Sequence, residues 1–345
     1  MERQGITRNI FAEMRLGECE APDRNIDRAN SLYKERQIRH LKRKRSKALT
    51  ICIASICELS TGNPRIVFCA DRLVTDANGL TFEQATPKIV QLLPNCLIMN
   101  AGDACHGDII VRDVFSRLNQ LTPDDAGKLT IKGIVEMVRE RVIAERNEAI
   151  ETELFAARGI DRRTFYSNFR SFQDWFALMV DTSVTNYSLD VSFIILGFDI
   201  SQEPQSVGVN LYEVRGNGEI QFDNPIGFSI VGIGSYQSLP EITKEPYSPN
   251  TTLSDSLVRT FWAKKLSERM VSVGRETTDL GIMFVELDPE SKKLVAKNTL
   301  LLDDFKNKVL SKAFEHQRKM LRNMTTKVQR NVAELLQGKK TIGKS

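Results

Sequence analysis

Three residues at the ends of predicted strands have the side chains needed to activate a hydroxyl nucleophile. Thr50 heads the first strand, Asp71 follows the second and Lys88 opens the third. A lysine ammonium beside a hydroxyl perturbs proton affinities, and an aspartate can hold that lysine in place. The set is suited to attack by a threonine hydroxyl that a base activates. Because Asp–Lys pairs on protein surfaces are common, these residues alone define no function.

The sequence lacks the residues that other kinds of catalytic or metal site would need. Of the three histidines, only His106 lies in a core-forming segment, which is too few for a Ser–His–Asp triad or a histidine-rich metal site. Asp103, Cys105, His106 and Asp108 have no CxxC partner, and adjacent side chains on a helix diverge. We therefore expect no metal and no cofactor. A Cys105 nucleophile at a helix start is the remaining alternative, and Gly232–Ser235 lacks the lysine of a phosphate-binding loop.

Composition is that of a globular protein. The chain has 345 residues, of which 41% are hydrophobic and 27% are charged, which excludes disorder over its whole length. No apolar run reaches the ~20 residues of a membrane span, and the charged N-terminus lacks the apolar stretch of a signal peptide. Six cysteines without an export signal are expected to be reduced thiols. We predict a cytoplasmic protein that does not contact a membrane.

Charge is unevenly distributed along the chain. Residues 1–49 carry 13 Lys and Arg against 7 Asp and Glu, and residues 306–345 carry 11 against 2. Residues 50–305 carry 24 against 35 and are acidic. Nucleic-acid binding is not expected, because only the two ends are basic.

The elements that must position the candidate residues alternate between strands and helices. Apolar and β-branched runs predict strands at 49–57, 66–70, 88–93, 96–101, 191–198, 209–214, 219–222, 228–232, 280–287 and 294–299. Helical spacing predicts helices after Gly102, with Ile109, Ile110, Val114 and Leu118 on one face, and at 130–158, 163–181, 254–273 and 305–337. The turn signals at Thr61–Pro64 and Asn217-Gly218 predict hairpins.

The residues around the candidate triad resemble the proteasome β-subunit family of N-terminal nucleophile (Ntn) hydrolases, and most resemble its bacterial proteasome-like branch. The matching segments are Thr50–Ala54, Ala70–Arg72, Lys88-Ile89, Asn100–Gly102 and the later turn Gly232–Ser235. Lys88 and Gly102 are 14 positions apart, as are the family's lysine and its oxyanion glycine.

The resemblance implies an α+β fold, a four-layer αββα sandwich of two antiparallel sheets, and the predicted strand order fits it. The Ntn-hydrolase domain would span residues 50–304. Residues 1–49 would be a basic, disordered leader or would precede the true start, and residues 305–345 would form a basic amphipathic helix.

The resemblance also implies the roles of a threonine peptidase or amidohydrolase. Thr50, as residue one of the mature chain, attacks an amide carbonyl while its own α-amine accepts the proton. Lys88 keeps that amine unprotonated, Asp71 holds Lys88, and the Gly102 N–H donates to the oxyanion. Ser235 would contact the amine.

Binding roles and partners follow from the same resemblance. Asn100 and Ala104 would line the pocket for the residue before the cut, which favours a small or neutral side chain. The expected partners are a peptide or protein substrate and further copies of the chain in a ring or related homo-oligomer. The tail helix would pack on its own domain or on a neighbouring copy. Any ATPase partner is unspecified.

Several residues depart from the family pattern and keep an alternative open. Asp103 follows the oxyanion glycine, where it is expected to cap the next helix, Ile233 replaces a serine, and Arg72 follows Asp71 directly. The family's second aspartate has only Glu276 and Asp279 as nearby candidates. The alternatives are a catalytically inactive proteasome-like scaffold or binding protein, or a DNA-associated factor that uses the basic ends.

The residue before Thr50 bears on how its amine becomes free. Leu49 stands where the family's propeptides usually have a glycine. Two leucine codons, TTG and CTG, also serve as bacterial start codons, so translation could begin there and removal of Met would expose Thr50. The competing expectation is a leader that is cut off by autolysis or is retained, and retention would mean an inactive protein.

Overall fold

The computed structural model describes residues 50–75, 81–83, 87–203, 205–270, 273–275, 277–301 and 306–336. All of these residues belong to one compact unit, Ser46–Ser345. The predictions made for residues 1–49, for Glu276 and for the chain beyond residue 336 lie outside the described residues.

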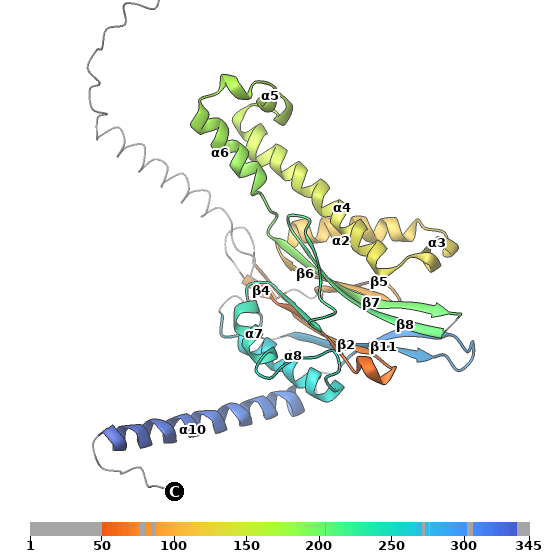
Figure 1. The fold of residues 1–345 in the computed structure, drawn as a ribbon, viewed down its shortest axis with the longest axis vertical. Coiled ribbons are helices and arrows are strands. Elements are labelled where there is room, and N and C mark those ends of the chain that lie inside the picture. Colours follow the sequence, from red (N-terminus) through yellow and green to blue (C-terminus); the bar gives the residue numbers. More distant parts are fainter. Residues whose placement is uncertain are drawn as a thin grey trace, which may run out of the picture. The chain divides into compact units, whose positions relative to one another are not determined.

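The described chain is an α+β structure with two five-stranded antiparallel sheets (Figure 1). The first sheet has the order β10 (Phe228–Val231), β1 (Cys52–Cys57), β2 (Arg65–Asp71), β11 (Thr278–Leu287) and β12 (Leu294–Leu300). The second has the order β5 (Ile89–Leu93), β6 (Cys96–Gly102), β7 (Val191–Gln202), β8 (Gln205–Arg215) and β9 (Ile220–Phe222). A separate hairpin pairs β3 (Leu73–Thr75) with β4 (Thr81–Glu83).

The two sheets pack face to face because their strands alternate side chains between two apolar layers. In β6, Leu97 and Met99 point into the core between the sheets, whereas Cys96 and Ile98 point outward to the helices. In β1, the alternate residues Cys52, Ala54 and Ile56 join the same inner core. Every residue of β1 is buried, which explains why all of them except Ser55 are apolar.

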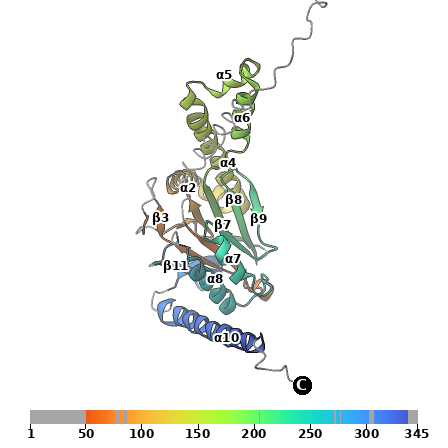
Figure 2. The same ribbon diagram turned by 90° about the vertical axis from the view of Figure 1, so that its left-hand side faces the viewer.

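Helices cover the outer face of each sheet. The face formed by β5–β9 packs against α2 and α4, and the face of the other sheet packs against α8, so that helices enclose the two sheets on both sides (Figures 1 and 2). α6 packs at the far end of α4. The helices are α2 (Ala104–Asn119), α3 (Pro123–Lys128), α4 (Ile131–Ile150), α5 (Arg162–Ser167), α6 (Asp174–Thr185), α7 (Ser235–Ile242), α8 (Leu253–Ser267) and α10 (Lys312–Leu336). α4 continues through a π-helical turn, Glu151–Phe155, into a 3₁₀ turn at Ala156–Arg158.

Three helix predictions need correction. Residues 163–181 form two helices, α5 and α6, because a 3₁₀ turn at Phe169–Ser171 interrupts them. Ile109 is exposed, whereas Ile110, Val114 and Leu118 are buried, since Ile109 lies one position beyond the face of α2 that meets the sheet. Sequence reasoning gave only a turn at Gly232–Ser235 and missed α7, whose eight residues are too short for a clear periodic pattern.

The tail helix is anchored at its beginning. Leu310 and Phe314 are buried, and the Phe314 ring lies 6.1 Å from the Trp262 ring of α8. Farther along, Met320, Met324 and Val328 are exposed at i, i+4 and i+8 on α10. Packing on its own domain is confirmed for the start of this helix, and packing on a neighbouring copy stays a prediction. Among the described helices, none combines the length and apolar character needed to cross a bilayer.

We predict that Gly281→Ala destabilises the fold. A Cβ at Gly281 in β11 would lie 2.4 Å from the Phe68 ring and 2.9 Å from the Thr299 carbonyl oxygen. Overpacking of this kind costs about 1–3 kcal/mol. Gly208→Ala in β8 is the matched control, because its nearest neighbours would lie 3.7 Å away. Chemical denaturation should show a lower free energy of unfolding for Gly281→Ala but not for Gly208→Ala. Equal effects of the two substitutions would contradict this packing.

Candidate active site

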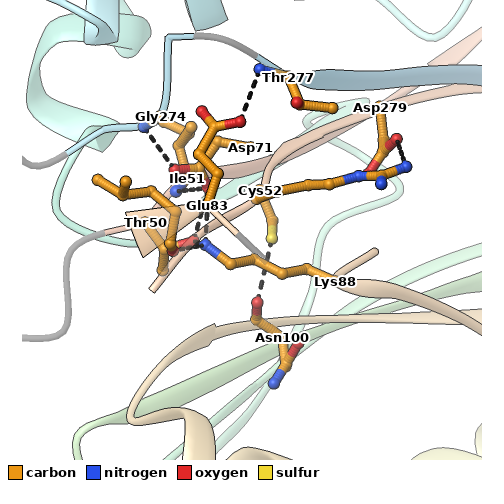
Figure 3. A network of polar contacts seen from close by, with 12 residues as sticks. Thr50, Ile51, Cys52, Asp71, Glu83, Lys88, Asn100, Gly274, Thr277 and Asp279 are labelled. Atoms are coloured by element: carbon orange, nitrogen blue, oxygen red, sulfur yellow. Dashed lines mark hydrogen bonds and ion pairs between the residues drawn. The ribbon is translucent and has the colours of Figure 1, made fainter. Parts of the chain in front are cut away.

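The Thr50 hydroxyl lies between an ammonium and a carboxylate (Figure 3). Lys88 Nζ donates to Thr50 Oγ1, and that hydroxyl donates to Asp71 Oδ1 at 2.8 Å. Lys88 Nζ also lies 2.9 Å from Asp71 Oδ1 and 2.5 Å from the Leu73 carbonyl oxygen. The structure thus brings together the three residues whose types first suggested nucleophilic chemistry.

Asp71 is the centre of this network. Its Oδ1 accepts from the Ile51 N–H at 3.1 Å as well as from Thr50 and Lys88. Its Oδ2 accepts from the Gly274 N–H at 2.8 Å. Both oxygens are therefore used, which fixes the plane of the carboxylate relative to the Thr50 hydroxyl.

Burial makes these contacts strong. Asp71 is fully buried, Thr50 is 2% exposed and Lys88 is 8% exposed. Charges removed from water need opposite charges and complete hydrogen bonding to be tolerated. The three protons of the Lys88 ammonium have three acceptors, namely Thr50 Oγ1, Asp71 Oδ1 and the Leu73 carbonyl.

Strand pairing explains how distant residues meet here. β1 and β2 are antiparallel neighbours with Cys52 opposite Ala70, so the residue before β1 and the last residue of β2 lie at one sheet end. The Asp71 N–H donates to the Ile51 carbonyl at 3.3 Å. Lys88 stands immediately before β5 of the facing sheet, and its carbonyl accepts from the Asn100 N–H of β6 at 3.3 Å. The site therefore joins the ends of both sheets.

The Gly232–Ser235 turn packs on the Thr50 backbone. Gly232 has a φ of 99°, and a Cβ there would lie 2.2 Å from the Thr50 carbonyl oxygen. The Gly234 N–H lies 3.5 Å from the same oxygen. Ser235 begins α7, and among the described residues no hydrogen bond joins its hydroxyl to Thr50. Its predicted contact with the Thr50 amine remains a prediction.

Gly102 and Asp103 shape the turn from β6 into α2. Gly102 has a φ of 109°, and a Cβ there would lie 2.0 Å from the Asp190 carbonyl oxygen, so only glycine fits. Asp103 accepts from the N–H groups of Cys105 and His106 and caps α2, as expected. Its carboxylate is thereby turned onto the helix end, where it stabilises the helix dipole. The oxyanion role of Gly102 stays a prediction.

The residues expected to bind substrate lie next to Lys88 and at the start of α2. The Asn100 carbonyl accepts from Cys52 Sγ at 3.3 Å, and its side-chain amide packs over Gly107, where a Cβ would approach Nδ2 to 2.5 Å. Ala104 is the first residue of α2 and is half-buried. Their place beside the site fits a binding role without testing it.

Asp279, a candidate for the second aspartate, pairs with Arg72. Arg72 donates to both of its oxygens, at 2.8 and 2.7 Å. This pair joins the end of β2 to β11 directly beside Asp71, which gives Arg72 a structural role. No hydrogen bond joins Asp279 to Thr50 in the described part of the chain.

In the part of the chain that the structure describes, no cysteine or histidine side chain hydrogen-bonds to the Thr50 hydroxyl. Burial raises the pKa of the Cys52 thiol, although the nearby Lys88 ammonium acts in the opposite direction, so Cys52 is an inert thiol. Cys105 is exposed on α2. His106 Nδ1 lies 2.9 Å from Glu145 Oε1 of α4, a contact between helices. The described residues contain no cluster of three side chains that could hold a metal.

Two residues of the network, Gly274 and Lys264, were not predicted from the sequence. Gly274 donates to Asp71, and its carbonyl accepts from Lys264 Nζ of α8 at 2.9 Å. Lys264 carries a usable signal, since a lysine on the apolar face of a predicted amphipathic helix needs a buried partner. Gly274 carries none, because one glycine in a loop has many possible causes.

Chemically, the centre can polarise a hydroxyl and stabilise negative charge as that charge develops on Oγ1. No protein-family model and no curated protein matches the chain.

We predict that Asp71→Ala strongly destabilises the protein, because it leaves the Lys88 ammonium buried without its carboxylate. Breaking a buried pair in this way costs about 3–5 kcal/mol. The double variant Asp71→Ala/Lys88→Met should recover part of that loss, since no buried charge remains unpaired. Asp108→Ala removes the exposed pair with Arg112 and should cost less than about 1 kcal/mol. Denaturation of the wild type, Asp71→Ala, Lys88→Met, the double variant and Asp108→Ala measures this. An additive double variant would contradict the coupling.

Proposed function

We propose that this protein is a threonine-type amidohydrolase of the Ntn-hydrolase class, similar to proteasome β-subunits, with Thr50 as its nucleophile. The observation that carries the proposal is the buried contact of Thr50 Oγ1 with Lys88 Nζ and Asp71 Oδ1. A hydroxyl held between an ammonium and a carboxylate is oriented and polarised as a nucleophile for covalent catalysis must be. The two facing antiparallel sheets between helices agree with the fold of that class.

The reaction follows from these positions. Thr50 Oγ1 attacks the carbonyl carbon of a peptide amide, and its proton passes to the Thr50 α-amine, whose ordinary pKa is ~7.7–8.0. The amine then protonates the leaving nitrogen, so the product is an acyl ester on Thr50 that water hydrolyses. The Lys88 ammonium stabilises the charge that develops on Oγ1, and Asp71 keeps Lys88 in place.

The free amine is the condition of this mechanism. In the 345-residue chain the Thr50 nitrogen is part of the peptide bond to Leu49, and an amide nitrogen cannot act as a base. Thr50 is also 2% exposed in this chain, so a substrate reaches its hydroxyl only after the groups that cover it have moved.

A second function is a non-catalytic scaffold of the same fold. Two observations favour it: Thr50 is buried, and neither Ser235 nor Asp279 hydrogen-bonds to it among the described residues. In that case the Thr50–Asp71–Lys88 network serves only to join the two sheets.

The N-terminus of the natively expressed protein separates the two functions. We expect intact-mass analysis to give a chain that begins at Thr50, because only then is the amine free. The control is the same protein with Thr50→Ala. If the leader is cut off by autolysis, this variant keeps it; if translation starts at codon 49, the initiator Met is still removed. Peptides from residues 2–34 in an otherwise mature assembly would support the scaffold and contradict the hydrolase.

Substitution of the nucleophile tests the chemistry itself. Thr50→Ala should lower the turnover of peptide amides with small neutral residues before the cut by more than about 1,000-fold, because nucleophile and base act as a unit. Lys88→Met should lose a similar amount, whereas Thr50→Ser keeps the hydroxyl and part of the rate. Circular dichroism controls for folding. Hydrolysis that is unchanged in Thr50→Ala would place the chemistry elsewhere, with Cys105 the next residue to test.

A further inference from the structure

A lysine of α8 lies fully buried behind the candidate active site. Lys264 is 0% exposed, and its ammonium donates to Glu268 Oε1 at 2.5 Å and to the Gly274 carbonyl at 2.9 Å. Burying a lysine is costly, and apolar side chains of similar volume usually stabilise a core as well or better. Packing alone therefore does not explain a cation at this position.

Lys264 contacts Gly274, and Gly274 in turn contacts Asp71. The Gly274 N–H donates to Asp71 Oδ2 at 2.8 Å, while its carbonyl accepts from Lys264. A Cβ at Gly274 would lie 2.8 Å from Glu83 Oε1, 3.1 Å from Leu73 Cβ and 3.2 Å from Asp71 Oδ2. A side chain at position 274 would therefore displace Glu83 and crowd Asp71. The two backbone hydrogen bonds, to Asp71 and from Lys264, orient the Gly274 peptide groups.

The other side of the Asp71 carboxylate faces Thr50. Its Oδ1 accepts from Thr50 Oγ1, Lys88 Nζ and the Ile51 N–H. Since a carboxylate is planar, a donor that fixes Oδ2 also fixes where Oδ1 lies. A continuous path of hydrogen bonds thus runs from Lys264 through Gly274 and Asp71 to the Thr50 hydroxyl (the Asp71 end is shown in Figure 3).

We propose that Lys264 is a positioning residue, which sets the orientation of Asp71, and through it of Lys88 and Thr50, by holding Gly274. Its catalytic consequence rests on the proposed function, whereas the positioning itself does not. Glu268 neutralises Lys264 and also pairs with Lys265 at 3.0 Å, so removal of Lys264 leaves Glu268 with a cation.

The neighbouring lysine provides a matched control. Lys265 shares Glu268 with Lys264 but is partly exposed, and its described contacts do not include Gly274. Lys264→Met and Lys265→Met therefore each remove one ammonium group that pairs with Glu268. Only Lys264→Met also removes the hydrogen bond to the Gly274 carbonyl. If Lys264→Met does not fold, Lys264→Gln keeps a polar side chain that is one atom shorter.

Amide hydrogen exchange of the full chain, resolved by residue with NMR, tests the positioning. In the Lys264 variants the Gly274 and Ile51 amides should exchange about tenfold faster, the effect expected when one buried hydrogen bond weakens. Amides at the β6–β7 pairing should stay unchanged, and Lys265→Met should match the wild type. Unchanged exchange at Gly274, equal acceleration in Lys265→Met, or acceleration throughout the fold would overturn the proposal.

Kinetics separate this proposal from the proposed function. In active protein, Lys264→Met should lower kcat about 10- to 100-fold, as small displacements of reacting groups do, with KM nearly unchanged. If the wild type shows no hydrolysis while the exchange result holds, the proposed function fails and the positioning role stands. If the wild type is active and Lys264→Met retains its full kcat, the catalytic consequence is overturned.

Discussion

The buried ion pair between Lys88 and Asp71 is the constraint around which the described structure is arranged. Neither charge tolerates burial alone, and the pair is completed by the Thr50 hydroxyl, the Leu73 carbonyl and the Ile51 and Gly274 N–H groups. Lys88 belongs to the start of one sheet and Asp71 to the end of the other. The pair therefore fixes how the sheet ends meet and leaves one hydroxyl between a cation and a carboxylate.

Backbone geometry supports this centre from two sides. Gly232 lets the chain after β10 pass against the Thr50 carbonyl, and Gly102 lets β6 turn sharply into α2. Asp103, the residue after the proposed oxyanion glycine, caps α2, and its carboxylate accepts hydrogen bonds from the N–H groups at the start of that helix. A side chain at Gly232 would displace the Thr50 backbone, and one at Gly102 would displace the Asp190 backbone against which β6 turns.

Sequence patterns predicted the strands around the site well, because buried strands such as β1 and β6 are mostly apolar runs with clear turns between them. The triad of Thr50, Asp71 and Lys88 followed from strand ends, and the structure brings the three together. What could not be predicted depends on tertiary contacts: the break between α5 and α6, the support of Asp71 by Gly274, and the pairing of Asp279 with Arg72. Local sequence does not encode the last two contacts, since each joins residues more than 200 positions apart in the chain. The break between α5 and α6 is local, but its 3₁₀ turn has no glycine or proline to mark it.

Covalent trapping tests the central claim, that Thr50 is the nucleophile. A β-lactone probe loses its ring C–O bond when a hydroxyl attacks its carbonyl, so the enzyme gains the full mass of the probe as an acyl ester. Incubation of the natively expressed protein, followed by fragment mass spectrometry, should place one acyl group on Thr50, and Lys88→Met should remain unlabelled. No adduct under conditions that label a serine hydrolase control, or an adduct on Cys105 instead, would contradict the account.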